Sequence, residues 1–190
     1  MRHTILLTLL CLALTPSSAQ LPDSLIQLWE YAIPTDVGTY QKTKSYLLQA
    51  VSKDSSLNNA QQLLDLTKNT QSKKNKGDAL ILNAIVALRK GDATSAIQYG
   101  EKALTFEASL SQFSLIDLYD TLAKSYSRQQ NYPPRIGYLN KLIELYKTQK
   151  NYHALAGAYN ELGGTYWGLS IYPSALDAYY QCTVQLYWKF

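Results

Sequence analysis

The chain has 190 residues, of which 46% are hydrophobic and 17% charged, and its formal net charge is +4 at pH 7. This excess is too small to indicate binding to nucleic acid through the phosphates. The densest basic patch, Lys68 with Lys73, Lys74 and Lys76, lies among polar residues and is interpreted as a solvated loop between helices. Composition therefore predicts no nucleic-acid partner.

Residues 1–19 have the three-part layout of a secretory signal peptide. Arg2 precedes an apolar run over 5–14, and residues 17–19 (Ser-Ser-Ala) place small side chains at the −3 and −1 positions of a cleavage site. The apolar run is about half of the ~20 residues that cross a bilayer, which disfavours an uncleaved anchor. The segment predicts an exported mature chain, periplasmic or secreted, with no stable membrane insertion after cleavage.

Cysteine usage sharpens this expectation. Lipidation at Cys11 is disfavoured because bulky leucines precede it, and Cys11 leaves with the signal peptide. Cys182 then remains alone, so no intrachain disulfide forms and the single domain expected over 20–190 depends on packing.

After the signal peptide, apolar residues recur at helical spacing and turn residues separate the runs, which predicts an all-α protein. Tyr159, Leu162, Gly163 and Tyr166, for example, share one stripe of a helix. The expected helices are 22–32, 38–52, 56–70, 76–90, 93–108, 113–130, 134–149, 152–169 and 173–188.

The C-terminal half matches itself when it is shifted by 40 residues. Such a fixed period is the signature of stacked repeats. The matched pairs are Tyr119 with Tyr159, Leu122 with Leu162, Tyr126 with Tyr166, Tyr132 with Tyr172 and Pro133 with Pro173. The repeats are expected at about 77–115, 116–155 and 156–190, after a degenerate pair at about 38–76.

The last unit carries a recognisable pattern: an aromatic residue, Leu-Gly and Tyr in its first helix, then Ala, an aromatic and a small residue in its second. The residues are Tyr159, Leu162, Gly163, Tyr166, Ala175, Tyr179 and Cys182. This pattern resembles the tetratricopeptide repeat. The resemblance implies a right-handed α-α superhelix of about four helical hairpins.

The sequence departs from that family in two ways. Its period of 39 to 40 exceeds the usual 34, which is typical of tetratricopeptide-like regions in bacterial signalling proteins. Asn83 and Gly100 replace large apolar residues in the unit at 77–115, which predicts a thinner core there.

Catalytic residues are scarce. His153 is the only histidine left after signal removal, and it is interpreted as a solvated residue at a helix start. Asp117 and Asp120 lie one turn apart, but no partner base accompanies them, so a solvated face is favoured over acid–base chemistry. The sequence predicts no catalytic residue, no metal site and no cofactor, and hence no enzyme.

Ligand contacts in tetratricopeptide domains come from the first helix of each pair, beside the packing stripe. The resemblance implies a concave partner-binding face made by Arg89, Asp117, Asp120, Lys124, Arg128, Asn160 and Trp167. Two interpretations stay open. Lys124 and Arg128 bind a carboxylate or carbonyl while Trp167 anchors an apolar group, or the charged residues over 117–128 form an intrahelical ladder of ion pairs.

The C-terminal helix indicates a second surface. Ala175, Tyr179, Cys182 and Leu186 are expected to pack inward. That leaves an apolar edge without a following repeat, which predicts a partner, a homodimer or a shortened array. The edge consists of Leu176, Tyr180, Val184 and Tyr187.

Together these features predict a non-enzymatic scaffold of the bacterial cell envelope that binds a protein or peptide. The alternative is the extracytoplasmic, sensor-type input region of a signal-transduction regulator, truncated or stand-alone. It is suggested because an export signal followed by long-period repeats resembles such regions.

Overall fold

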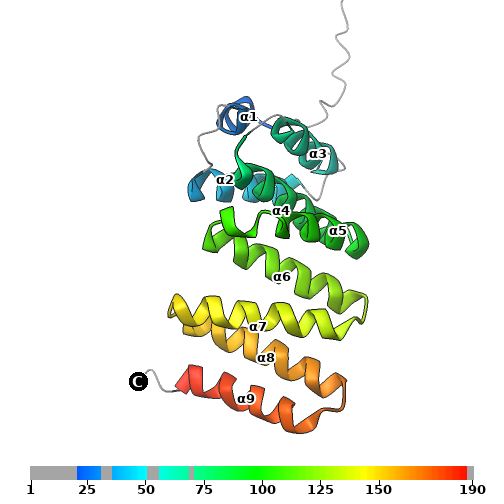
Figure 1. Ribbon diagram of the computed structural model, residues 1–190, viewed down its shortest axis with the longest axis vertical. Coiled ribbons are helices and arrows are strands. Elements are labelled where there is room, and N and C mark those ends of the chain that lie inside the picture. The colour runs from blue at the N-terminus through cyan, green and yellow to red at the C-terminus, as the bar shows by residue number, and fades with distance from the viewer. Residues whose placement is uncertain (1–20, 31–35, 51–55, 69–70, 188–190) are drawn as a thin grey trace, which may run out of the picture.

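The computed structural model describes residues 21–30, 36–50, 56–68 and 71–187. These residues form nine α-helices and one short 3-10 helix, stacked in chain order from one end of the molecule to the other (Figure 1). Both ends of each helix lie within four residues of the predicted range. The helices are α1 (Asp23–Glu30), α2 (Val37–Ala50), α3 (Ser56–Thr67), α4 (Lys73–Arg89), α5 (Ala93–Leu104), α6 (Gln112–Arg128), α7 (Tyr132–Thr148), α8 (Tyr152–Gly168) and α9 (Tyr172–Tyr187), with the 3-10 helix η1 (Glu107–Ser109) before α6. The predicted signal peptide lies outside the described residues.

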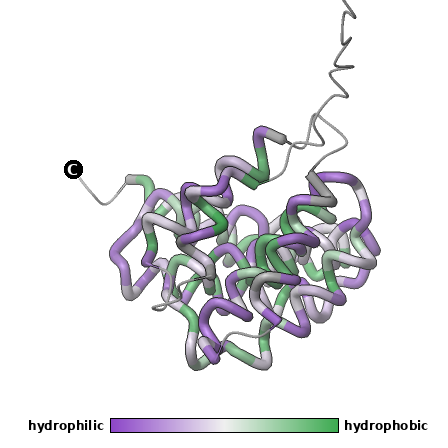
Figure 2. The backbone as a smooth tube through the Cα atoms, turned by 90° about the horizontal axis from the view of Figure 1, so that it is seen from above, coloured by the Kyte–Doolittle hydropathy of each residue, from purple (hydrophilic) through white to green (hydrophobic). Residues whose placement is uncertain are grey.

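The helices pack as sequential antiparallel pairs. The pairs α4–α5, α6–α7 and α8–α9 each contact the next pair through α5–α6 and α7–α8, while α2, α4 and α6 also touch along one side. Polar and apolar segments alternate along each helix (Figure 2), as amphipathic helices packed on their neighbours require. Helices α6 and α8 begin 40 residues apart, as do α7 and α9, so the repeat of the sequence is a repeat of the backbone.

The same short turn joins the helices of this stack. After α4, α6, α7 and α8 one residue adopts a left-handed conformation, and the next N–H donates to the carbonyl oxygen five residues earlier, which satisfies the helix end. The left-handed residues are Gly91 (φ 92°), Gln130 (φ 55°), Lys150 (φ 53°) and Ser170 (φ 60°), and the bonds are Asp92 N to Ala87 O, Asn131 N to Tyr126 O, Asn151 N to Tyr146 O and Ile171 N to Tyr166 O, at 2.9 to 3.0 Å.

The core continues through the unit that the sequence predicts to be thin. A Cβ atom on Gly100 would lie 2.6 Å from Cδ2 of Leu122, so a leucine from the next unit already fills that space. The side-chain amide of Asn83 is buried and donates to the carbonyl oxygens of Ala60 (2.8 Å) and Ala79 (2.9 Å), which ties α4 to α3. The prediction of a thinner core is therefore wrong at Gly100, because close backbone approach replaces side-chain volume.

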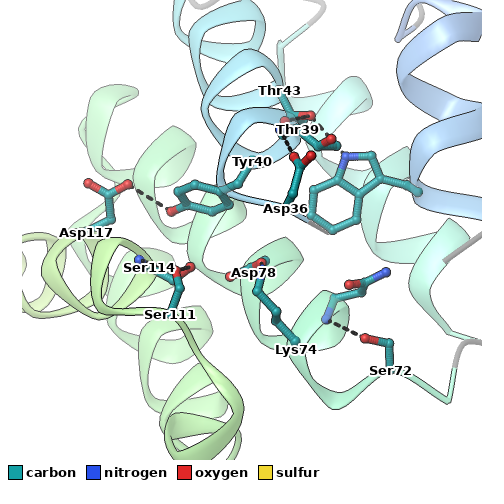
Figure 3. Close-up of polar contacts among 12 residues, drawn as sticks. Asp36, Thr39, Tyr40, Thr43, Ser72, Lys74, Asp78, Ser111, Ser114 and Asp117 are labelled. Atoms are coloured by element: carbon teal, nitrogen blue, oxygen red, sulfur yellow. Dashed lines mark hydrogen bonds and ion pairs between the residues drawn. The ribbon is translucent and has the colours of Figure 1, made fainter. Parts of the chain in front are cut away.

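The basic patch is also not the loop that the sequence predicts. Lys73, Lys74 and Lys76 lie in the first turn of α4, and Ser72 caps the helix by accepting from the N–H of Asn75 (3.2 Å) (Figure 3). Nζ of Lys74 lies 2.5 Å from Oδ2 of Asp78, whose side chain is fully buried. This lysine neutralises a buried carboxylate, which would be costly to bury without a partner.

Candidate functional site

A groove of about 510 Å³ lies between α2, α4, α6 and the start of α7. We call it the charged groove. Its residues are Lys44, Leu48, Ile85, Leu88, Arg89, Asp117, Asp120, Thr121, Lys124, Ser127, Arg128 and Arg135. Five of the seven residues predicted for a concave face are among them: Arg89, Asp117, Asp120, Lys124 and Arg128. Three helices that are distant in sequence therefore bring these five residues together.

The groove is positively charged. It holds five basic and two acidic side chains, an excess of three positive charges, over an apolar base of Leu48, Ile85 and Leu88. Because the chain as a whole has an excess of only four, most of its imbalance corresponds to the charge of this one surface. Such a concentration favours an anionic ligand and raises its rate of encounter.

Both lysines of the groove are paired with its two carboxylates. Nζ of Lys44 lies 2.6 Å from Oδ1 of Asp117, and Nζ of Lys124 lies 2.7 Å from Oδ2 of Asp120. Asp117 also accepts a hydrogen bond from the hydroxyl of Tyr40 at 2.9 Å (Figure 3). Burial, and then the nearby Asp117 carboxylate, raise the pKa of Tyr40 well above its ordinary value, so this hydroxyl stays protonated as a donor. Asp117 thus holds α2 against α6.

The three arginines have mostly neutral partners. Nη1 of Arg128 donates to the carbonyl oxygen of Leu88 (2.6 Å), and Nη1 of Arg135 donates to Oγ of Ser127 (2.6 Å). Nη2 of Arg135 approaches a Glu161 carboxylate oxygen only to 3.6 Å, and its buried Nε has no partner among the described residues. Arg89 makes no hydrogen bond or ion pair with any residue that the structure describes. We call Arg89, Arg128 and Arg135 the arginine end of the groove.

The chain matches no model of a known protein family, and no curated protein matches it. The resemblance carried by the tyrosine, leucine and glycine positions therefore remains a prediction. What the chain binds has to be argued from the geometry of its own surfaces.

The structure limits the alternative interpretation of the charged residues on α6. An ion-pair ladder would link Asp117, Asp120, Lys124 and Arg128 along one helix. Only Asp120 and Lys124 form such a pair, since Asp117 bonds to α2 and Arg128 to the end of α4. Three of the four residues therefore connect α6 with other helices or remain available to a ligand.

The two remaining predicted residues do not line the charged groove. Asn160 and Trp167 are both exposed on α8. The indole of Trp167 is 61% exposed, and its ring meets that of Tyr172 edge-on with 5.1 Å between centroids. A role for Trp167 as an anchor in the groove is not supported by this geometry.

The predicted C-terminal edge lies on α9. Leu176 is 72% exposed and Tyr180 62%, whereas Val184 is partly buried, and the side chain of Tyr187 lies outside the described atoms. One residue expected to pack inward does not, because Leu186 is 45% exposed. Exposed apolar area on α9 is therefore larger than the sequence predicts.

Sequence reasoning missed two basic residues of the groove. Lys44 lies in the degenerate unit, where no repeat match identifies a position, and it is found only through its ion pair with Asp117. Arg135 stands where the last unit has Ala175, which is buried. A charged residue at a normally small position was a signal that could have marked it.

Other kinds of site were sought over the same residues. In the described part of the chain, no three His, Cys, Asp or Glu residues gather in a way that could hold a metal ion. None of its helices combines the length and apolar character needed to traverse a membrane. His153 is exposed and Cys182 is a free, partly buried thiol.

Proposed function

We propose that this chain is a non-enzymatic, tetratricopeptide-like scaffold that holds a protein or peptide partner in its charged groove. The observation that carries the proposal is the arginine end. Three guanidinium groups from α4, α6 and α7 converge beside an apolar base, without a carboxylate in direct contact. Guanidinium groups bind carboxylates through two parallel hydrogen bonds, so this arrangement suits a partner with acidic groups.

The repeat architecture supports the same proposal. Successive pairs of helices offset by 39 or 40 residues form an extended surface, and such arrays bind partners along a concave side. The close approach within the last pair follows the family pattern. A Cβ atom on Gly163 would lie 2.7 Å from Cε1 of Tyr179. A right-handed superhelix and a place in the bacterial cell envelope belong to this proposal, and the latter rests on the predicted signal peptide.

The experiment compares two labelled peptides of about ten residues, one with several glutamates and one with glutamines in their place. Fluorescence anisotropy should show at least about tenfold tighter binding of the acidic peptide, because only it pairs with the arginine end. Arg89→Glu should reduce that affinity by about tenfold or more, without unfolding the chain, since Arg89 has no partner among the described residues.

The matched control is Lys102→Glu, which makes the same change of charge on exposed α5, outside the groove. It should alter the affinity by less than about threefold, as distant exposed charges are screened by salt. Equal binding of both peptides, or an equal effect of both variants, would contradict the proposed groove.

The exposed face of α9 favours a second contact surface. Leu176 and Tyr180 present apolar area with no helix packed over it among the described residues. We propose that this face joins two copies of the chain or receives a partner. Light scattering should report loss of any dimer in the Leu176→Ser, Tyr180→Ser double variant. A monomer in both proteins would leave the charged groove as the only proposed contact.

A further inference from the structure

The middle unit contains a sandwich of three tyrosine rings. The ring of Tyr138 on α7 stacks on Tyr119 and on Tyr126, with 6.0 Å between centroids in each case and interplanar angles of 26° and 12°. Tyr119 and Tyr126 are two turns apart on α6, about 10 Å along the helix, so the Tyr138 ring lies between them. As a result, Tyr119 is only 4% exposed and Tyr126 only 9%.

The last unit has the outer two rings of this sandwich but not the inner one. Tyr159 and Tyr166 on α8 stand 40 residues after Tyr119 and Tyr126, with the same spacing of two turns. The residue 40 after Tyr138 is Ala178. An open cleft of about 480 Å³ occupies this position, and Tyr159 and Tyr166 are only partly buried. We call this cleft, lined by Tyr159, Leu162, Tyr166, Ala178, Asn140 and Asp177, the tyrosine slot.

The chain does not fill the tyrosine slot with its own nearby ring. The tyrosine of α9 comes one residue later, at Tyr179, and its ring packs on Gly163, where a Cβ atom would lie only 2.7 Å away. Leu162 provides an apolar base and is 6% exposed. Asp177 provides a carboxylate that makes no hydrogen bond or ion pair with any described residue. The slot therefore has two aromatic sides, an apolar base and a hydrogen-bond acceptor.

We propose that the tyrosine slot binds one aromatic side chain of a partner peptide, stacked between Tyr159 and Tyr166 as Tyr138 is stacked in the middle unit. Asp177 and Asn140 accept a hydrogen bond from a phenol or indole, so tyrosine and tryptophan bind better than phenylalanine. The inference rests on the proposed scaffold function only in that the ring comes from a peptide. The slot shares no residue with the charged groove.

The test is an NMR titration of the full chain with N-acetyl-L-tyrosinamide and, as a comparison, N-acetyl-L-leucinamide. The tyrosine amide should shift the methyl resonances of Leu162 and Ala178. Its dissociation constant should be at least about tenfold lower, because two aromatic faces contribute beyond the burial of area. Equal shifts with both amides would overturn the proposal.

Two variants of α9 locate the binding. Ala178→Tyr should place a ring of the chain itself in the slot and abolish the shifts of the Leu162 methyl groups. Leu176→Tyr adds the same ring to the exposed face of α9 and should leave binding unchanged. Should Ala178→Tyr fail to fold, Tyr166→Leu provides the second measurement, with an expected loss of at least about fivefold.

Two further outcomes separate this proposal from its competitors. If sedimentation shows that the chain self-associates and that Ala178→Tyr abolishes the association, a second copy fills the slot and the peptide proposal is overturned. Arg89→Glu should retain full binding of the tyrosine amide. Failure at the slot therefore leaves the charged groove untouched, and failure at the groove leaves the slot untouched.

Discussion

The middle unit (α6–α7) and the last unit (α8–α9) share a backbone and differ in what fills the space between their helices. In the middle unit Tyr138 closes the gap beside α6, and the two flanking tyrosines are buried. In the last unit Ala178 leaves the corresponding gap beside α8 open. One side chain therefore decides whether the same pair of rings forms core or presents a binding surface.

A second difference places the charged groove on one unit alone. Arg135 of the middle unit lines the groove and bonds to Ser127, whereas its counterpart Ala175 is 1% exposed and packs within the last pair. The positions that maintain the helix pairs are the same in both units, and those beside them vary. A repeat can thus keep its fold while each copy acquires a separate surface.

The largest effect should follow from opening the closed unit. Tyr138→Ala removes the central ring and should lower the free energy of unfolding by about 2–3 kcal/mol, since it takes buried contacts from Tyr119 and Tyr126 together. Urea denaturation measures the change. Tyr180→Ala is the matched control, because that ring is 62% exposed, and it should cost less than about 0.5 kcal/mol. A loss at Tyr138 no larger than that of the control would mean that the stacked rings contribute little.

The reverse substitution should close the open unit. Ala178→Tyr is expected to raise the free energy of unfolding by about 1 kcal/mol, as two new ring pairs gain more than the tyrosine loses in rotamer freedom. Thermal and urea unfolding would both report it. Leu176→Tyr should change stability by less than about 0.5 kcal/mol. A marked loss in Ala178→Tyr would show that the slot is narrower than its counterpart.

Charge also distinguishes the two units. The hydroxyl of Tyr126 donates to Glu101 at 2.5 Å, and the residue 39 positions after Glu101 is the uncharged Asn140. Tyr126→Phe should cost about 1 kcal/mol at neutral pH through the lost hydrogen bond. Burial, followed by the bond to Glu101, raises the pKa of Tyr126 above its ordinary value.

The sign of the pH effect follows from that shift. The folded chain keeps the Tyr126 proton at a pH where the unfolded chain, with a tyrosine pKa of about 10, releases it. This stabilisation is complete below about pH 10 and is lost as the pH rises above it. Urea midpoints at neutral and alkaline pH should therefore fall less in Tyr126→Phe than in the unchanged chain. An identical fall would mean that Tyr126 ionises as readily when folded.

Much of the fold could be predicted because the repeat marks it directly. Matches such as Tyr119 with Tyr159 fix the offset between helix pairs, and small residues such as Gly163 mark close approach. Five groove residues follow from helical spacing alone. Lys44 could not be predicted because its contact with Asp117 joins residues 73 positions apart. The tyrosine slot escaped for another reason, since Ala178 is informative only once the ring of Tyr138 has been placed.

The smallest expected effect concerns the feature that the two units share. Gln130 and Ser170 hold the same left-handed conformation after α6 and α8, with φ of 55° and 60°. That conformation costs a residue with a Cβ atom about 1–2 kcal/mol, whereas glycine adopts it freely but loses more entropy on folding. Gln130→Gly and Ser170→Gly should each raise the free energy of unfolding by about 0.5 kcal/mol, measured by urea denaturation. Because the turns match, the two gains should agree within error. A gain at one turn and a loss at the other would show that the backbone equivalence of the units stops short of their turns.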